Sequence, residues 1–199
     1  MHQSSFENMR AFREKYLRGR EREPLKIIDL GSCDINGSYR PLFNEPKWSY
    51  QGVDLEKGPN VDIVLQDPYL FSGIESNSVD VLISGQAFEH IEFFWITMLE
   101  IARVLKPGGL CCVIAPSGGY EHRYPVDCWR FYRDGFRALA RFAHLQTKEI
   151  YTMTEIDCKG FTDESRQWRD TVMICEKPKW SWWQRFKMRT AATILRSLL

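Results

Sequence analysis

Two histidines of this chain are candidates to accept a proton in a reaction. His122 lies in the polar and aromatic segment 117–132, and His90 follows a predicted strand at 79–83. An imidazole with its usual pKa of about 6.5 can take a proton from a hydroxyl group near neutral pH. We expect His122 to be the general base, with Asp127 either orienting it or binding substrate. His90 is the second candidate for the base.

The segment 117–132 is typical of a binding loop. It is too polar for a protein core and too aromatic for an idle linker, and loops of this kind commonly carry binding residues. We predict that it covers a substrate pocket. The residues expected to contact the substrate are Tyr124 and Trp129, which would stack on a ring, and Arg130. The alternative interpretation is that Trp129 and Phe131 anchor the loop to the core while His122 is solvated.

Carboxylates stand at the ends of three short apolar segments. Asp29 and Asp54 end two of them, 25 positions apart, and Asp67 follows the third. Nucleotide-binding sheets place an acid at the end of the second strand, where it accepts hydrogen bonds from both ribose hydroxyls. Gly31 lets a ligand approach the backbone closely. Asp29 can accept a hydrogen bond from a cationic group, and Asp67 can accept one from an adenine amino group.

Apolar strand patterns alternate with helical patterns along most of the chain. Near-helical spacing of apolar residues predicts helices at 6–17, 93–105 and 136–143. Mostly apolar runs predict seven strands, at 25–31, 50–54, 61–65, 79–83, 110–115, 145–151 and 171–175. This alternation predicts an α/β fold with a doubly wound, mainly parallel seven-stranded sheet. Ligands bind such sheets at the carboxyl ends of the strands.

Two further stretches carry a family resemblance. Residues 78–91 contain Glu-His-Ile at 89–91, and residues 99–109 end in Arg-Val-Leu-Lys-Pro-Gly-Gly at 103–109. With the acid-ended strands, they resemble the class I S-adenosylmethionine-dependent methyltransferases over about residues 25–176. The resemblance implies a Rossmann-like sheet whose last two strands form an antiparallel hairpin, and S-adenosylmethionine as the cofactor. The cofactor-binding residues that it implies are Asp29, Gly31, Ser32, Asp54, Leu55, Asp67 and Gln86, with Gln86 beside the methionine end.

The loop after the first strand departs from the family pattern. The family usually repeats glycine at alternate positions there, whereas this chain has Cys33 and Ile35, with Asn36 and Gly37 just downstream. This departure supports an alternative class, a catalytically inactive methyltransferase-like binding protein. A nicotinamide-dependent dehydrogenase shares the acid after the second strand but is disfavoured, because Gly-x-Gly-x-x-Gly is absent from the sequence.

The expected reaction is methyl transfer to an oxygen, with nitrogen as the less favoured atom, of a small molecule or saccharide. Aromatic faces suit sugars, and arginine binds anionic groups such as phosphate. A role in cell-surface polysaccharide biosynthesis follows by analogy only.

The length of 199 residues fits one domain. The formal charge is +1, but residues 177–199 hold six basic residues and no acidic one, so residues 1–176 are net acidic. We divide the chain into a methyltransferase domain at 1–176, with an N-terminal helix within 1–24 and a core at 25–176, and a basic amphipathic helix at 177–199. The acidic domain offers no basic channel, so we expect no nucleic-acid partner.

The cysteines indicate a reducing compartment. Cys111, Cys112 and Cys175 lie in apolar runs, where a free thiol packs as a small hydrophobe. No Cys/His spacing is typical of zinc, and His122 with Asp127 gives too few ligands, so we predict no metal site. The N-terminal residues lack the apolar core of a signal peptide, and no stretch is long enough to span a membrane. We therefore expect a cytoplasmic protein.

Residues 177–199 have an amphipathic pattern. Met188, Ala192 and Leu195 share one side of the predicted helix, opposite basic residues that include Arg189, and three tryptophans precede them. Such a helix suits an anionic membrane surface, such as the inner face of the cell membrane. The same pattern fits a helix docked on its own domain or on a second copy in a homodimer, and these interpretations stay open.

Overall fold

A mixed seven-stranded sheet forms the centre of the molecule. The computed structural model describes residues 2–161 and 165–199. The strands are β1 (Lys26–Leu30), β2 (Ser49–Asp54), β3 (Ile63–Val64), β4 (Val79–Gly85), β5 (Leu105–Ala115), β6 (Gln146–Thr152) and β7 (Thr171–Glu176). Their order in the sheet is β3-β2-β1-β4-β5-β7-β6. The neighbours among β1 to β5 pair in parallel, and β7 pairs antiparallel with both β5 and β6. This arrangement confirms the predicted Rossmann-like fold with an antiparallel last hairpin.

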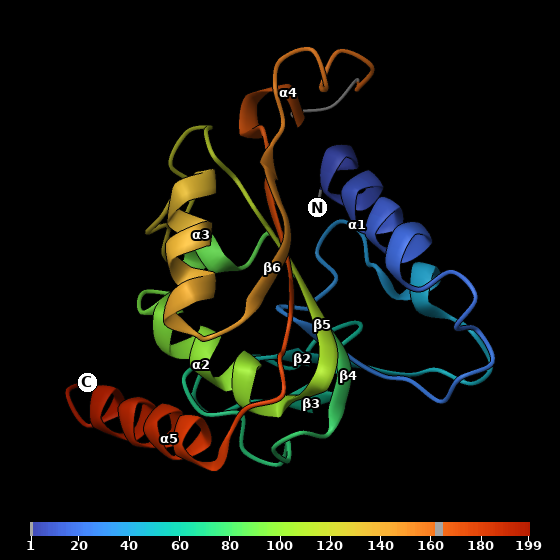
Figure 1. The fold of residues 1–199 in the computed structure, drawn as a ribbon. Helices are drawn as coiled ribbons and strands as arrows, with labels where there is room; N and C mark the ends of the chain where they lie inside the picture. The colour runs from blue at the N-terminus through green and yellow to red at the C-terminus, as the bar shows by residue number, and fades with distance from the viewer. Residues whose placement is uncertain (1, 162–164) are drawn as a thin grey trace.

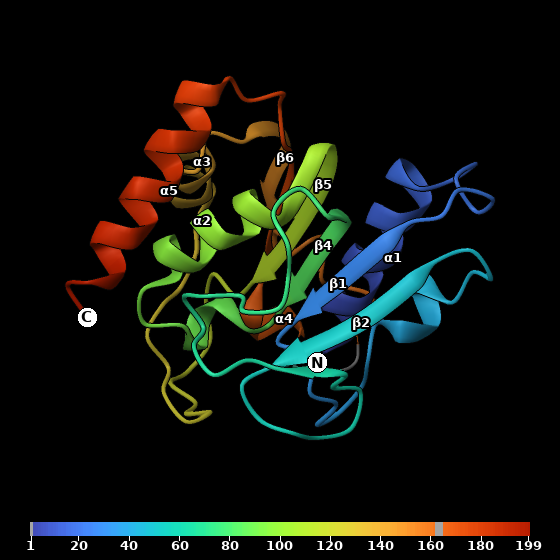
Figure 2. The ribbon, with the colours of Figure 1, turned by 90° about the horizontal axis from the view of Figure 1, so that it is seen from below.

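Helices cover both faces of the sheet. The α-helices are α1 (Gln3–Tyr16), α2 (Phe94–Val104), α3 (Arg133–Phe142), α4 (Ser165–Trp168) and α5 (Trp182–Arg196), and two 3₁₀ helices are η1 (Arg40–Phe43) and η2 (Phe88–His90). Figure 1 shows α1 on one face of the sheet and α2, α3 and α5 on the other. Figure 2 shows β2, β1, β4 and β5 side by side between these two layers.

Alternate side chains of the inner strands enter two different cores. In β4, Val81 and Ile83 pack in the core under α1, whereas Leu82 packs in the core under α2 and α3. In β5, Cys112 and Cys111 divide in the same way, and both are free and buried as predicted. Because successive side chains of a strand point to opposite faces, a sheet covered on both faces needs apolar residues at nearly every position.

The connections in the first half of the chain are less helical than the alternating pattern predicts. The connection from β1 to β2 contains only η1, and residues 55–62 and 65–78 contain neither helix nor strand. Pro41 and Pro46 lie in the first connection, and proline removes the backbone donor that a helix interior needs. The sheet is therefore covered thinly around β2 and β3.

Helix α5 docks on its own domain. Ser181 caps its first turn, and Met188 and Ala192 are buried in the core that contains α2. Arg196 lies 3.6 Å from the Glu100 carboxylate of α2. The apolar stripe of this helix is thus covered by the same chain. Within the described residues, no helix has the length and hydrophobicity needed to cross a bilayer.

Lys177 is the first basic residue of the segment 177–199, but the structure buries its side chain. Its side chain is 2% exposed. Its Nζ donates hydrogen bonds to Asn77 Oδ1 over 2.8 Å and to the carbonyls of Arg103 over 3.2 Å and Leu105 over 2.7 Å. Burial lowers the pKa of Lys177 to about 8. This lysine therefore ties the end of β7 to the core and adds no charge to the exposed tail.

Candidate active site

The turn after β1 lies over the end of β2. Both Gly31 N and Ser32 N donate hydrogen bonds to Val53 O, over 2.9 Å and 3.2 Å. Ser32 Oγ also donates to Asn60 O over 3.2 Å. The turn therefore sits at the carboxyl edge of the parallel strands, where ligands bind in open α/β sheets.

Asp29 has a buried carboxylate with one unpaired oxygen. The hydroxyl of Tyr50 on β2 donates a hydrogen bond to Oδ2, whereas Oδ1 has no hydrogen-bond partner among residues 2–161 and 165–199. Burial raises the pKa of Asp29 to about 7. A buried oxygen without a partner costs free energy unless a donor reaches it. The site at Asp29 therefore fits a cationic or hydrogen-donating group of a ligand.

Gly31 occupies a backbone position that a larger residue cannot share. Its φ angle is +78°, and a Cβ added there would lie 2.4 Å from the Cβ of Ala87, which follows β4. Since that distance is far below van der Waals contact, the turn after β1 requires glycine.

Asp54 organises the loop that departs from the family pattern. Its Oδ2 accepts a hydrogen bond from Cys33 N over 2.9 Å, and its Oδ1 accepts one from Leu55 N over 2.7 Å. The Asp54 carboxylate thus ties the loop after β1 to β2 without the repeated glycines. The Leu55 side chain is exposed. Asp67, after β3, accepts a hydrogen bond from Tyr69 N over 2.7 Å.

Gln86 links the end of β4 to a buried polar cluster under the start of α1. Its Nε2 donates to Ser5 Oγ over 3.2 Å and to Asp170 Oδ1 over 3.0 Å. Asp170, directly before β7, also accepts a hydrogen bond from Ser4 Oγ over 2.6 Å and lies 3.2 Å from His2 Nε2. The sequence gives no signal for this cluster, because a serine pair and a strand-start aspartate form no motif.

The Asp127 carboxylate holds the segment 117–132 in place. Asp127 accepts a hydrogen bond from His122 N over 2.7 Å and two from the Arg130 guanidinium, over 2.6 Å and 2.7 Å. These hydrogen bonds, with that of Arg130 as the largest cause, lower the pKa of Asp127 to about 2. His122 Nδ1 lies 3.3 Å from Asp127 Oδ2. The structure brings the three residues together, and their functional roles stay predictions.

The two aromatic candidates of this segment differ in their surroundings. Trp129 Nε1 donates to Glu92 O over 3.0 Å, and its ring packs edge-on against Phe94 and Trp95, with centroids 5.3 Å and 6.1 Å away. Tyr124, in contrast, is 62% exposed. Trp129 therefore anchors the loop to the domain, whereas the Tyr124 ring is accessible.

Glu89, His90 and His122 form a cluster beside this segment. One nitrogen or oxygen atom from each residue lies within 4.8 Å of those of the other two. Glu89 is fully buried, and neither of its carboxylate oxygens has a hydrogen-bond partner in the described part of the chain. Burial raises the pKa of Glu89 to about 8 and lowers the pKa of His90.

The sequence predicts both histidines of the cluster but not Glu89. Glu89 stands within the Glu-His-Ile stretch, directly after the buried Phe88. Its place in the Glu-His-Ile stretch is the signal that could have identified it, because buried acids are rare unless they have a role.

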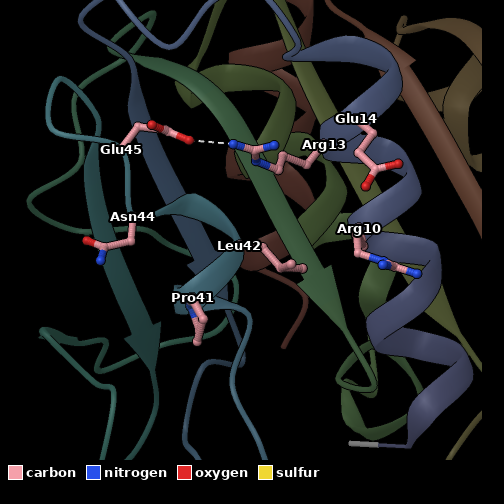
Figure 3. Close-up of a pocket in the computed structure, with 7 residues that line it drawn as sticks. All are labelled: Arg10, Arg13, Glu14, Pro41, Leu42, Asn44 and Glu45. Atoms are coloured by element: carbon pink, nitrogen blue, oxygen red, sulfur yellow. Dashed lines mark hydrogen bonds and ion pairs between the residues drawn. The ribbon is translucent and has the colours of Figure 1, made fainter.

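Two hollows lie outside the cluster. The hollow in Figure 3 has a volume of about 180 Å³, lies between α1 and η1, and is lined by Arg10, Arg13, Glu14, Pro41, Leu42, Asn44 and Glu45. Within it Arg13 and Glu45 form an ion pair, and it contains none of the predicted site residues. The second, of about 590 Å³, lies beside the end of β6 and is lined by Tyr132, Arg133, Asp134, Thr152, Met153, Thr154, Glu155 and Arg169.

Comparisons with known sequences point to one class of enzyme. Residues 29–113 match a family described as a methyltransferase domain. An uncharacterised methyltransferase of Mycobacteroides abscessus is 27% identical over 192 residues, which cover 84% of this chain and 70% of that relative.

Solved methyltransferases share the fold. The 1,6-didemethyltoxoflavin-N1-methyltransferase of Burkholderia thailandensis, solved with 1,6-didemethyltoxoflavin and S-adenosylhomocysteine, has a TM-score of 0.67 at 15% identity, over 88% of this chain and 79% of that chain. Phosphoethanolamine N-methyltransferase 2 of Haemonchus contortus, solved with S-adenosylmethionine, has a TM-score of 0.60 at 17% identity, over 86% of this chain and 53% of that chain. The shared fold confirms the predicted Rossmann-like sheet, and the match over residues 29–113 supports the predicted class, the S-adenosylmethionine-dependent methyltransferases.

Proposed function

We propose that this methyltransferase transfers a methyl group to a hydroxyl oxygen of a small molecule or saccharide. The observation that carries the proposal is the cluster of Glu89, His90 and His122, which lies just beyond the ends of β4 and β5. A hydroxyl group must lose its proton as the methyl group arrives, and imidazole and carboxylate groups serve that step. A neutral amine attacks with its lone pair and needs no prior deprotonation. Nitrogen is therefore the second choice of acceptor atom.

The carboxyl edge of β1 and β2 is assigned to the cofactor. The unpaired Oδ1 of Asp29 suits the ammonium group of S-adenosylmethionine, and Asp54, at the end of β2, suits the ribose hydroxyls. Glycine at position 31 lets the turn pack closely against the Ala87 side chain, which follows β4. The residues assigned to the cofactor are Asp29, Gly31, Ser32, Asp54, Leu55, Asp67 and Gln86. When bound, the cofactor supplies a methyl group on a sulfonium, which is a good electrophile.

The segment 117–132 is assigned to the acceptor. We place the accessible Tyr124 ring against the acceptor and His122 beside its hydroxyl group. Asp127 accepts hydrogen bonds from both His122 and Arg130, so we assign Asp127 and Arg130 to positioning the loop. Trp129 has the same role through its packing on α2.

We further propose that the enzyme works at the inner membrane surface on a lipid-linked glycan precursor. The first turns of α5 expose Trp182, Trp183 and Phe186, whose side chains are 63%, 63% and 53% exposed. Arg185 and Lys187 lie between and beside them in the sequence. Interfacial aromatic rings next to cations suit an anionic lipid surface. A second copy of the chain is the competing occupant of this surface.

The first test measures binding and transfer separately. Calorimetry with the full chain measures S-adenosylmethionine binding, and transfer of a labelled methyl group is then measured on panels of saccharides, other alcohols and amines. We expect binding, transfer to at least one hydroxyl compound, and no transfer to the same compound with that hydroxyl already methylated. Transfer to amines alone would contradict the proposal.

The second candidate function is a methyltransferase-like binding protein without activity. Cys33 and Ile35 in the loop after β1 favour it, since they replace glycines that the family usually has. This candidate predicts ligand binding with no methyl transfer on any panel.

A further inference from the structure

The cluster of Glu89, His90 and His122 has the donor set of a metal centre. Two imidazoles and one carboxylate, each with one ligand atom within 4.8 Å of the others, converge on one point. Glu89 and His90 both belong to η2, and His90 is its last residue. His122 belongs to the segment after β5. Two imidazoles and a glutamate are the protein ligands of several catalytic zinc sites, in which a further position stays open to water or substrate.

Both histidines of the cluster have a ring nitrogen that is free to bind a metal ion. His90 Nδ1 lies 2.6 Å from the carbonyl oxygen of Val126, so this nitrogen carries the proton and Nε2 keeps its lone pair. His122 Nδ1 is buried 3.3 Å from Asp127 Oδ2 and has no hydrogen-bond partner among the described residues. Histidines that bind metals usually donate their other nitrogen to a carbonyl or carboxylate, as His90 does.

The carboxylate of Glu89 is the second, independent sign of a missing partner. It is fully buried, and both of its oxygens lack a hydrogen-bond partner among residues 2–161 and 165–199. The charged groups that act on it are Asp170, Arg130 and Asp127. Two carboxylates against one guanidinium leave a net negative charge, which favours a cation at this point.

We propose that Glu89, His90 and His122 bind one divalent transition-metal ion, with zinc as the best fit to these donors. Imidazole ligands favour zinc over magnesium, which prefers oxygen ligands. Ligand atoms around a zinc ion lie about 3–3.5 Å apart, because each metal–ligand bond is about 2.0–2.2 Å long. Since the ligand atoms lie within 4.8 Å of one another, binding requires the three side chains to close in by up to about 1.5–2 Å.

The metal site does not depend on which molecule accepts the methyl group. In the zinc-loaded enzyme the open position would hold an acceptor hydroxyl, whose pKa the ion lowers. His122 would then act as a ligand, because its Nε2 lone pair cannot bind a metal ion and a proton together.

The test uses the full chain, freed of metal by dialysis against a chelator. Zinc binding is followed by calorimetry, and Co²⁺ is followed by its visible absorption spectrum. We expect one zinc ion per chain and much weaker binding of Mg²⁺. Glu89→Gln and His122→Ala should abolish the binding, and Asp127→Asn should weaken it by about 10–100-fold through the orientation of His122. Thermal unfolding confirms that each variant is folded.

Two matched variants separate this site from adventitious binding. Cys128→Ser removes an exposed thiol next to the cluster, and His144→Asn removes an exposed histidine outside it. Both should bind zinc as the wild type does. The proposal is overturned if the wild type binds no zinc, if Glu89→Gln and His122→Ala bind it normally, or if Cys128→Ser or His144→Asn removes it. None of these outcomes depends on methyl transfer, so a failure of the proposed reaction is seen separately.

Discussion

Arg130 donates two parallel hydrogen bonds to Asp127, from Nη1 to Oδ1 over 2.6 Å and from Nη2 to Oδ2 over 2.7 Å. The carboxylate is almost fully buried and also accepts the backbone N–H of His122. This pair therefore fixes the position of His122 within the segment 117–132. A two-bond pairing of this kind depends on the planar guanidinium group.

Arg130→Lys keeps the charge but cannot form both hydrogen bonds with the same geometry. We expect the free energy of unfolding to fall by about 1–2 kcal/mol, since a charge-assisted hydrogen bond is lost. Turnover should fall while the affinity for S-adenosylmethionine stays within about twofold, because the residues assigned to the cofactor lie elsewhere. Urea unfolding, calorimetry and kcat measure the three quantities. Arg137→Lys, at the exposed pair with Asp134, is the matched control and should change none of them.

Asp29 should make cofactor binding depend on pH. Burial raises its pKa to about 7, and a cationic ligand group binds the ionised form. The affinity for S-adenosylmethionine should therefore rise from pH 5 to pH 7, by up to about tenfold per pH unit, and binding below pH 7 should release a proton. Asp29→Asn should remove this pH dependence. Calorimetry in buffers of different ionisation enthalpy measures both effects.

The same pKa shift has an opposite effect on the stability of the free protein. The pKa of Asp29 is raised on folding from its usual 3.8 to about 7, so its contribution is fully present below about pH 4 and is lost as the pH rises to 7. The difference in unfolding free energy between wild type and Asp29→Asn should therefore decrease over this range. A difference that is constant with pH would show that Asp29 is ionised throughout.

Gly31→Ala should disrupt the turn that is assigned to the cofactor. The new Cβ would lie 2.4 Å from the Cβ of Ala87, at a φ of +78°. We expect a loss of about 1–3 kcal/mol of stability and a large loss of cofactor affinity. Gly135→Ala is the matched control, because Gly135 lies within α3 and its Cβ would meet no atom within 4 Å among the described residues. That variant should gain about 0.5–1 kcal/mol. Equal effects of the two substitutions would contradict the structure at Gly31.

Lys177 should add stability at alkaline pH. Burial lowers its pKa from 10.5 to about 8, so the folded state disfavours the charged form and this penalty is relieved as the pH rises from about 8 to 10.5. The unfolding free energy of wild type relative to Lys177→Met should thus increase between pH 8 and pH 10, by up to about 1.4 kcal/mol per pH unit. Urea unfolding with a thiol reductant measures it, and a flat or falling difference would show that the ammonium group is solvated.

The fold was predictable because its signals are local. The inner strands are apolar at nearly every position, and β4 and β5 show the reason, since Leu82 and Cys111 enter one core while Val81 and Cys112 enter the other. The acids that end β1 and β2 could be placed for the same reason, because a strand end defines a position in the sheet.

The cluster of Glu89 with the two histidines was not predictable from spacing. Glu89 and His122 are separated by the whole of α2 and β5, and they meet only because β4 and β5 lie side by side. The surface on which α5 docks was not predictable for a similar reason. The apolar pattern around Met188 fits any apolar surface, and the contact with α2 depends on tertiary packing.

The exposed aromatic surface of α5 should bind anionic vesicles. Met188 and Ala192 are covered by the domain, so we assign the contact to the exposed rings of Trp182, Trp183 and Phe186. Replacement of these three residues with alanine should abolish co-sedimentation with phosphatidylglycerol vesicles, while wild type should pellet and be released by salt. Ile194→Ala, on the exposed side of the same helix, is the matched control and should still bind. The oligomeric state from light scattering separates the alternative, because a concentration-dependent dimer that the triple substitution dissolves, with no vesicle binding by wild type, would assign this surface to a second copy of the chain.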